Sequence, residues 1–467
     1  MPLPITVATV TLRQALRNRS LPAACLLVTA LLALSGYVSG RNQDLTNRQR
    51  SEYSEKVRSH WLQQPDRHPH RVAHYGYLAF RPKSPLAYFD SGLDSFGGVA
   101  VFLEAHRQNT TNFSEAGQSA ALIRFGELTP ALVLQLIVPL LLFVLGFPVV
   151  SGEREGGTLA LSLAQGVSSR TLLAGKALGL LAMVPALLLP GMAILLAVRG
   201  VPDSGLLPRI LALALAYGLY LAVVVWIAAA VSAASRSSRA ALTTLLVLWV
   251  VACVAMPRAL LTLGAARAPL PSKAQFDAMV DRDLAQEGDS HNPNDPHFAQ
   301  LRARTLQKYG VRDVRDLPFN YSAFVMEESE KITSGIFRRH YSGILDTFQR
   351  QSRPLEWGAL VNPYLAIRAL SMALAGSDLD HFLDFQRQAE TFRYDMIQNL
   401  NELHRTRIRL ENDRAQKVSR DTWGGFPEFV YTPPSVAEVW RRRWTACAVL
   451  AAWLALLAVC TLRGRLL

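Results

Sequence analysis

Six long apolar stretches of this chain contain no Asp, Glu, Lys, Arg or His. An α-helix needs about 20 residues to cross the roughly 30 Å hydrocarbon core of a bilayer, and each stretch is close to that length. One such stretch fits a buried helix of a soluble protein, but six in one chain indicate a membrane protein. We therefore predict an α-helical membrane protein with six transmembrane helices. They lie at residues 21–40, 128–150, 177–198, 210–235, 240–257 and 444–462.

Basic residues are concentrated in the short segments that join these stretches. Cytoplasmic loops of membrane proteins carry an excess of Lys and Arg, so both ends of the chain and the polar elbow at 151–176 are predicted to be cytoplasmic. The net charge of +13 then reports topology rather than nucleic-acid binding. The segments predicted to be cytoplasmic contain only two acids, Glu153 and Glu155. Their basic residues are Arg13, Arg17, Arg19, Arg154, Arg170, Lys176, Arg236, Arg239, Arg463 and Arg465.

Two long insertions, 41–127 and 258–443, are left on the extracytoplasmic side by this topology. The second is long enough to form its own core and reads as mostly α-helical. Residues 1–20 are predicted to be an amphipathic connecting segment on the inner surface, with Ile5, Ala8, Leu12 and Leu16 facing apolar neighbours. No disulfide is expected in the insertions, because all cysteines fall in apolar stretches. These are Cys25, Cys253, Cys447 and Cys460.

Helical periodicity is clearest near the end of the second insertion. Ser377 is a candidate N-cap with Asp380 three residues later, and the helix is predicted to run to about residue 415 with an apolar stripe facing the core. Another helix is predicted at 322–352. The stripe consists of Leu379, Phe382, Phe385, Ala389, Phe392, Met396, Leu400 and Leu403.

Two other segments are less regular. Residues 355–375 are apolar but interrupted, and we expect them to pack under the outer domain or enter the outer leaflet rather than span. The first insertion is rich in Pro and Gly, which indicates turns and short elements, followed by a helix near 99–107.

Catalytic motifs are absent from the sequence. The only inner Gly-Lys pair, Gly175-Lys176, is followed by Ala177, so there is no phosphate-binding G-x-x-x-x-G-K-[ST] loop. There is also no H-E-x-x-H, G-x-S-x-G or Cys-x-x-Cys. Because the apolar stretches lack ionisable side chains, they do not suit a proton or ion relay. We predict no catalytic residue and no cofactor on this chain, so its driving force must come from elsewhere.

Four histidines of the first insertion are weak candidates for a metal site: His60, His68, His70 and His74. Imidazole groups at this density can hold Zn²⁺ or Cu²⁺. No cysteine joins them, however, their spacing matches no metal motif, and Pro69 interrupts the local geometry. Our interpretation is that they are solvated or structural histidines.

The elbow contains short polar motifs at both of its ends. Acids near the start of a short helix are favoured by its positive end, the two glycines allow a turn or close approach, and a threonine can cap locally. Such an elbow suits contact with a soluble partner. The motifs are Glu153-Arg154-Glu155-Gly156-Gly157-Thr158, Ser168-Ser169-Arg170 and Gly175-Lys176.

These motifs, in their order between membrane spans, resemble the permease subunits of ABC-2 type transporters. The outer segments resemble a bacterial branch of that family that has enlarged periplasmic domains and an unassigned substrate. Residues that carry this finer resemblance include Trp61, Pro85-Leu86, Asp90-x-Gly92, Leu103-Glu104-Ala105-His106, Asn362-Pro363, 371–378 and 385–390.

The resemblance implies a half-transporter in the bacterial inner membrane, with large domains on the periplasmic side. Two permeases, identical or related, would work with two ABC ATPase subunits that bind ATP and Mg. The elbow would hold the coupling helix. Membrane lipids and an envelope protein are further partners, and nucleic acid is not. The coupling residues implied are Glu153, Arg154, Glu155, Gly157, Thr158, Ser168, Arg170 and Lys176.

Prolines flank the elbow on both sides and mark sites where a transmembrane helix can kink. They are Pro139, Pro148, Pro185 and Pro190. Two functions stay open: an exporter of a hydrophobic substrate, and a mechanotransducer that acts on an envelope partner without transport through itself. A membrane-bound metalloenzyme that uses the histidines is a distant third.

Overall fold

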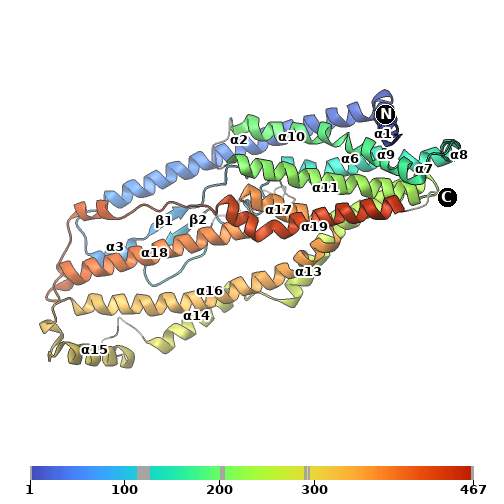
Figure 1. Cartoon of the computed structure of the whole chain (residues 1–467). Helices are drawn as coiled ribbons and strands as arrows, with labels where there is room; N and C mark the ends of the chain where they lie inside the picture. The colour runs from blue at the N-terminus through green and yellow to red at the C-terminus, as the bar shows by residue number, and fades with distance from the viewer. Residues whose placement is uncertain (1–2, 113–126, 200–205, 289–291, 293–294, 464–467) are drawn as a thin grey trace.

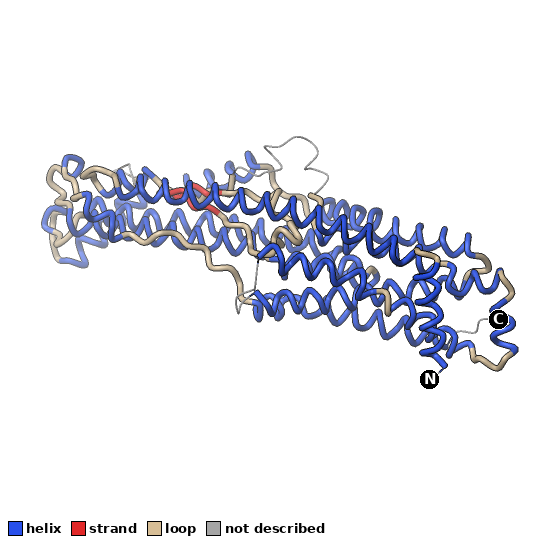
Figure 2. Tube along the Cα trace, turned by 90° about the horizontal axis from the view of Figure 1, so that it is seen from above, coloured by secondary structure: helices blue, strands red, loops and turns tan. Residues whose placement is uncertain are grey.

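The chain forms an elongated, mostly helical molecule (Figures 1 and 2). A computed structural model describes all residues except 1–2, 113–126, 200–205, 289–291, 293–294 and 464–467. Helices α1 and α8 and the end of α19 lie at one end of the molecule, and α3, α15 and most of α16 lie toward the other (Figure 1). The predicted elbow and the predicted insertions are therefore at opposite ends.

Helices dominate the described residues, and two short strands pair with each other. Strands β1 (Tyr77–Phe80) and β2 (Ala100–Leu103) are antiparallel, with Tyr77 opposite Leu103. Turns of π-helix form η2 (Val133–Ile137) and η3 (Val251–Ala255). The helices in chain order are α1 (Leu3–Arg17), α2 (Ser20–Leu62), α3 (Pro69–Tyr75), α5 (Pro130–Leu132), α6 (Val138–Gly146), α7 (Pro148–Glu155), α8 (Thr158–Ala164), α9 (Ser169–Leu181), α10 (Val184–Arg199), α11 (Leu206–Ala234), α12 (Ser238–Val250), α13 (Met256–Arg267), α14 (Lys273–Glu287), α15 (Pro296–Tyr309), α16 (Tyr321–Val361), α17 (Pro363–Ala375), α18 (Leu379–Arg407) and α19 (Val436–Arg463). Three 3₁₀ turns are η4 (Val314–Asp316), η5 (Asp413–Ala415) and η6 (Arg420–Gly425).

Six helical runs among the described residues are long and apolar enough to cross a membrane. All six predicted stretches are helical, but the helices are longer than the apolar runs. The third begins at Ser169 rather than 177, and the fifth continues to Arg267 rather than ending at 257. The runs are Ser20–Leu62, Pro130–Glu155, Ser169–Leu196, Leu206–Ala234, Ser238–Arg267 and Val436–Arg463.

Prolines interrupt the regular hydrogen bonding of these runs. A proline has no backbone N–H and its ring collides with the carbonyl four residues earlier. The π-helical turn η2 directly precedes the first turn of α6, which contains Pro139, and Pro148 opens α7. Pro185 follows the break between α9 and α10, whereas Pro190 lies inside α10. The sequence did not single out Pro257, which follows η3 in the same way.

Helix α17 answers the question left open for the segment 355–375. Its residues Ala366, Ile367, Leu370 and Leu374 are fully buried in the same apolar core as the membrane helices. It packs against α11 and α19. Helix α17 therefore lies in the helical bundle and also packs under the first insertion, since Ser371 donates to Asp90 at 2.6 Å and Phe89 shares its core.

The two insertions share one hydrophobic core. Trp61, Tyr77 and Leu103 from the first pack with Phe385 and Trp423 from the second. The Trp61 indole N–H donates to the backbone carbonyl of Trp423 at 3.2 Å. The two insertions, predicted as separate domains at 41–127 and 258–443, therefore pack against each other, and together they are called the outer domain below.

The helix predicted near 99–107 is wrong, since β2 occupies this stretch. Its β-branched and aromatic side chains suit a strand, and the pairing with β1 satisfies backbone groups that a helix would satisfy internally. Short apolar runs do not distinguish a strand from a helix by periodicity alone. The apolar stripe predicted at 379–403 in the second insertion is long enough to identify a helix.

Helix α18 confirms that pattern, with shifted ends. Its N-cap is Asp378, which accepts a hydrogen bond from the backbone N–H of His381, rather than Ser377. It ends at Arg407 rather than near 415. The predicted stripe faces the core, and its buried members are Phe385, Ala389, Met396 and Leu400. The helix predicted at 322–352 is contained in α16.

A buried ion-pair network joins α16 to α18. Glu330 accepts a hydrogen bond from Arg393 at 2.6 Å, and Glu390 accepts another from it at 2.7 Å. Burial disfavours the charge of Glu330, but its hydrogen bond with His106 and the positive charge of Arg393 outweigh burial and lower the pKa of Glu330 to about 2. The outer domain therefore contains buried charged side chains, and each of them is paired with a side chain of opposite charge.

Candidate functional site

The elbow between the second and third spans consists of α7, a glycine turn, the short helix α8 and the start of α9. Gly157 precedes α8 with φ = 75°, a conformation that favours glycine. A Cβ at this position would meet nothing within 4 Å, so the glycine serves the turn rather than close packing. Ser168 caps α9 by accepting a hydrogen bond from the Thr171 backbone N–H at 3.2 Å.

Glu153 and Lys176 form an ion pair that joins α7 to α9. The Lys176 side chain is only 3% exposed, and that of Glu153 is 24% exposed. A buried ammonium needs a partner because its desolvation is costly. The pair therefore fixes the two limbs of the elbow to each other.

Arg154 and Glu155 bind the ends of two further helices. Arg154 donates to the carbonyls of Ala233, at 2.9 Å, and Ser235, at the C-terminal end of α11. Glu155 accepts from the Ser238 backbone N–H at 3.0 Å and from its hydroxyl at 2.6 Å, at the N-terminus of α12. These placements match the negative and positive ends of the helix dipoles.

The position of the two acids corrects the sequence-based expectation. Glu153 and Glu155 lie in the last turn of α7 and do not begin the short helix. Thr158, the first residue of α8, donates its hydroxyl to the Glu153 carbonyl at 3.3 Å, so the local bond expected of it forms. Three consecutive charged residues thus contact three different helices, α9, α11 and α12.

Ser232 is a linking residue that the sequence analysis missed. Its hydroxyl accepts from the backbone N–H groups of Val150, at 3.0 Å, and Ser151, at 3.1 Å, and donates to the Phe147 carbonyl at 2.6 Å. These backbone groups lie where Pro148 interrupts the helix. The signal available was a serine three residues before the end of the apolar run 210–235, which also contains Ser235.

Helix α8 presents most of its surface to solvent at the end of the molecule (Figure 1). Leu159 is buried and anchors it, whereas Leu161 is 60% exposed. Thr158 and Arg170 are exposed on the same elbow. The arrangement is a short helix, rigidly attached at its base, with a free face that can receive another protein.

Helix α1 packs along α9, and only part of its predicted apolar face takes part, because Leu12 packs against the core whereas Ile5 and Leu16 do not. Thr11 and Ala15 are its buried residues, while Ile5 and Leu16 are each 48% exposed. A Cβ on Gly175 would lie 2.5 Å from Val7, and one on Gly179 would lie 2.7 Å from Thr11. Because glycines allow this close approach, the side of α1 that carries Val7 and Thr11 faces α9, while Ile5 and Leu16 face outward.

The four candidate histidines do not form one group. His60 is exposed on α2 and lies outside both clusters of possible metal ligands that the described residues contain. His68 is grouped with His404 and Asp413, whereas His70 and His74 are grouped with His106. The sequence missed His404 and His106 because they lie far along the chain from 60–74.

Taken together, the bundle, the exposed elbow and the outer domain define a multi-pass α-helical membrane protein with a short, solvent-exposed helix at one end. Residues 5–292 match the ABC-2 family transporter protein, and residues 273–432 match a domain of unknown function, DUF3526. The first match covers more than half of the chain, so this chain belongs to the ABC-2 family of transporter proteins as a membrane transport component. No curated protein matches it.

Proposed function

We propose that the chain is the permease subunit of an ATP-driven exporter, and that α8 docks on a separate ABC ATPase. The family implies an ABC ATPase partner in general. The observation that carries the proposal is the contrast within the elbow. The Leu161 side of α8 is exposed, while the three charged residues just before α8 are bound to other helices.

In this proposal, force on α8 reaches the bundle through α7. Glu153 passes it to α9, Arg154 to the end of α11 and Glu155 to the start of α12. The π-turn before Pro139 and the break at Pro148 lie in the same span, where hydrogen bonding is already irregular. These are the places where the span bends most easily.

The working assembly that we propose has two permeases, either copies of this chain or relatives, and two ATPases that bind ATP and Mg. It lies in the inner membrane of a bacterium, with α1, α8 and the end of α19 in the cytoplasm and the outer domain in the periplasm. The grouping of these three elements at one end of the molecule supports this orientation (Figure 1).

A cavity in the bundle supports a hydrophobic cargo. It has a volume of about 390 Å³ and is lined by residues of α6, α11, α17 and α19 and of the run from α12 through η3 to α13. Its lining is almost entirely apolar and includes Phe143, Tyr220, Trp249, Met256 and Trp453. Such a lining, which contains no charged side chain, suits a lipid-like or apolar peptide group better than a bare ion.

A mechanotransducer is the alternative, and the continuity of α2 favours it. This helix runs without interruption from the bundle core at Val28 and Leu32 to the outer core at Trp61. In this alternative, bending of the bundle moves the outer domain against an envelope protein. Cargo transport by the reconstituted complex would favour the exporter, whereas ATP hydrolysis stimulated only by an envelope protein would favour the transducer.

Docking is tested by co-purification with the ATPase. We expect Leu161→Asp to reduce the co-purified ATPase at least tenfold, because it places a charge on the exposed face of α8 without removing an internal contact. Val430→Asp is the matched control, since Val430 is 74% exposed on the outer domain. Equal co-purification of the two variants, with unchanged elution and Tm, would reject α8 as the docking element.

A further inference from the structure

Five of the chain's ten histidines gather in one part of the outer domain. His68 and His404 have ring centroids 4.4 Å apart, and His404 lies 6.4 Å from His70. His70 and His74 then lie near His106. These residues come from α3, from the loop after β2 and from the end of α18, so the fold brings them together.

One group within this gathering is centred on the carboxylate of Asp413. Asp413 lies 3.1 Å from Nε2 of His68 and 2.9 Å from Nε2 of His404, and it accepts from Asn320 at 2.6 Å. Nδ1 of His68 accepts from the His70 backbone N–H at 3.2 Å. Burial disfavours the charge of Asp413, but these hydrogen bonds outweigh it and hold its pKa far below the usual range. This network fastens α3 to α18.

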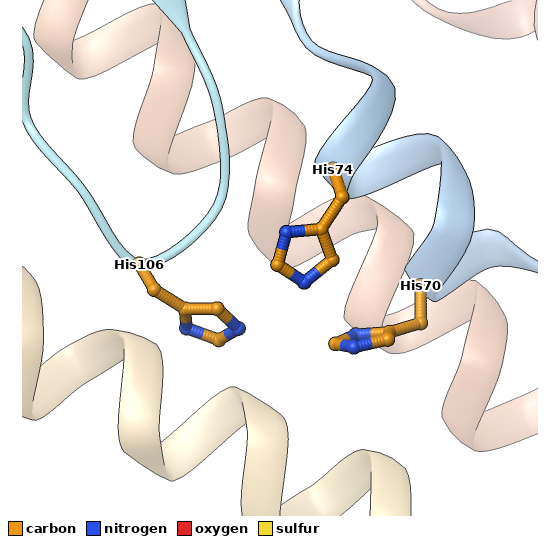
Figure 3. Close-up of side chains that lie close together, drawn as sticks. All are labelled: His70, His74 and His106. Atoms are coloured by element: carbon orange, nitrogen blue, oxygen red, sulfur yellow. The ribbon is translucent and has the colours of Figure 1, made fainter.

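The other group, His70, His74 and His106, has the arrangement of a ligand set. His70 and His74 are one helical turn apart on α3, and each of the three offers one ring nitrogen within 4.8 Å of the others. Figure 3 shows the three rings facing a common space. Their centroids are 4.7 Å apart for His70 and His74, and 5.4 Å apart for His74 and His106.

His106 is held in place by a buried carboxylate behind it. Glu330 Oε2 lies 3.3 Å from His106 Nδ1 and accepts from the His106 backbone N–H at 2.9 Å. With Nδ1 donating to Glu330, the tautomer of neutral His106 has its lone pair on Nε2. Metal-bound histidines commonly have such a carboxylate partner, which fixes both tautomer and ring orientation.

The backbone at His106 is also unusual. Its φ of 59° lies in the left-handed region, which non-glycine residues seldom occupy. Strained positions of this kind cluster at ligand sites, where the surrounding structure holds them. Glu330 provides that hold here, and it is itself fixed by Arg393.

We propose that His70, His74 and His106 bind a divalent transition-metal ion of the Zn²⁺ class. Three neutral imidazoles suit Zn²⁺, Co²⁺, Ni²⁺ or Cu²⁺ and leave a further coordination position open. Nitrogens at about 2.0 Å from a tetrahedral ion lie roughly 3.3 Å apart, so small side-chain rotations complete the site. His74 is exposed, which gives the ion an entry path. The bound ion would clamp α3 to the loop after β2, independently of the proposed ATPase coupling.

Direct metal titration tests the site. Tag-free protein, purified in detergent and stripped with a chelator, is titrated with Zn²⁺ against a colorimetric chelator and with Co²⁺ by its visible absorption. We expect one tight site per chain, weakened at least tenfold in His74→Ala and in His106→Asn. The first variant changes an exposed residue, and Asn tolerates a left-handed backbone. His60→Ala is the matched control and should bind as the wild type does.

Two outcomes would overturn the proposal. The first is that the folded wild type binds neither ion tightly. The second is that binding survives in both His74→Ala and His106→Asn but is lost in His404→Ala, which would move the ion to the neighbouring network. A Zn²⁺-dependent rise in Tm that is present in the wild type and in His60→Ala, but absent in His74→Ala, would support the assignment.

Discussion

The elbow and the outer domain hold their charged residues in different ways. In the elbow, Glu153, Arg154 and Glu155 each reach a different helix and remain partly or fully exposed. In the outer domain, Glu330 and Arg393 are buried together and share their partners. The first arrangement links many elements through single contacts, and the second stabilises one body. Movement at the elbow should therefore spread through the bundle, while the outer domain should respond as a unit.

The largest expected effect concerns the sides of the membrane on which the two regions lie. Single cysteines are introduced as Arg170→Cys in the elbow and Lys308→Cys in the outer domain, without the four native cysteines. An impermeant thiol reagent should label Lys308→Cys from the periplasm and Arg170→Cys only in inverted vesicles, because both positions are exposed at opposite ends. Labelling of Arg170→Cys from outside would remove the basis of the coupling proposal.

Breaking the buried network should be the costliest single change in the outer domain. Arg393→Ala leaves Glu330 and Glu390 without their cation, and we expect a loss of about 3–5 kcal/mol in the free energy of unfolding. Arg387→Ala on the same helix is the control, since its exposed pair with Asp384 is worth about 0–1 kcal/mol. Similar denaturation curves for the two variants would show that the buried Arg393 pairs contribute no more to stability than the Arg387–Asp384 pair does.

A smaller effect is expected from Glu153→Gln in the elbow. Lys176 would remain buried without its counter-charge, but partial exposure of Glu153 reduces the loss to about 2 kcal/mol. Replacing Lys176 by Met in addition should recover most of the Tm, because the buried charge is gone. An unchanged Tm combined with loss of the ATPase would instead indicate that Glu153 pairs with the partner.

The smallest effect should come from the glycine turn. Gly157→Ala places an L side chain at φ = 75° and should cost about 1 kcal/mol, while Gly156→Ala, at φ = −80°, should cost less. Thermal unfolding of both variants measures the difference. Equal Tm values would show that the turn relaxes without penalty.

The sequence predicted the features that depend on local composition. Six apolar runs identified the six spans, and a repeat of three and four residues identified α18 and its core-facing side. Both signals lie within one helix and need no knowledge of the fold.

The sequence did not predict the features that depend on contacts between residues far apart in the chain. The partners of Glu153 and Arg154 lie 23 and about 80 positions away, and His404 is far from His68. Strand β2 has too few residues for a reliable period, and α17 reads as punctuated although its neighbours bury most of its residues. In each of these examples the structure depends on contacts with residues elsewhere in the chain and not on local propensity alone.

The length and continuity of helix α2 determine how far its outer end moves when its base tilts. Its 43 residues extend about 65 Å at 1.5 Å each, with no break along the way. If the base tilts by about 5°, the tip moves roughly 6 Å sideways, which is about the rise of one helical turn along its axis. A helix of this length converts a small tilt among the packed bundle helices into a displacement of several ångströms at Trp61 in the outer domain.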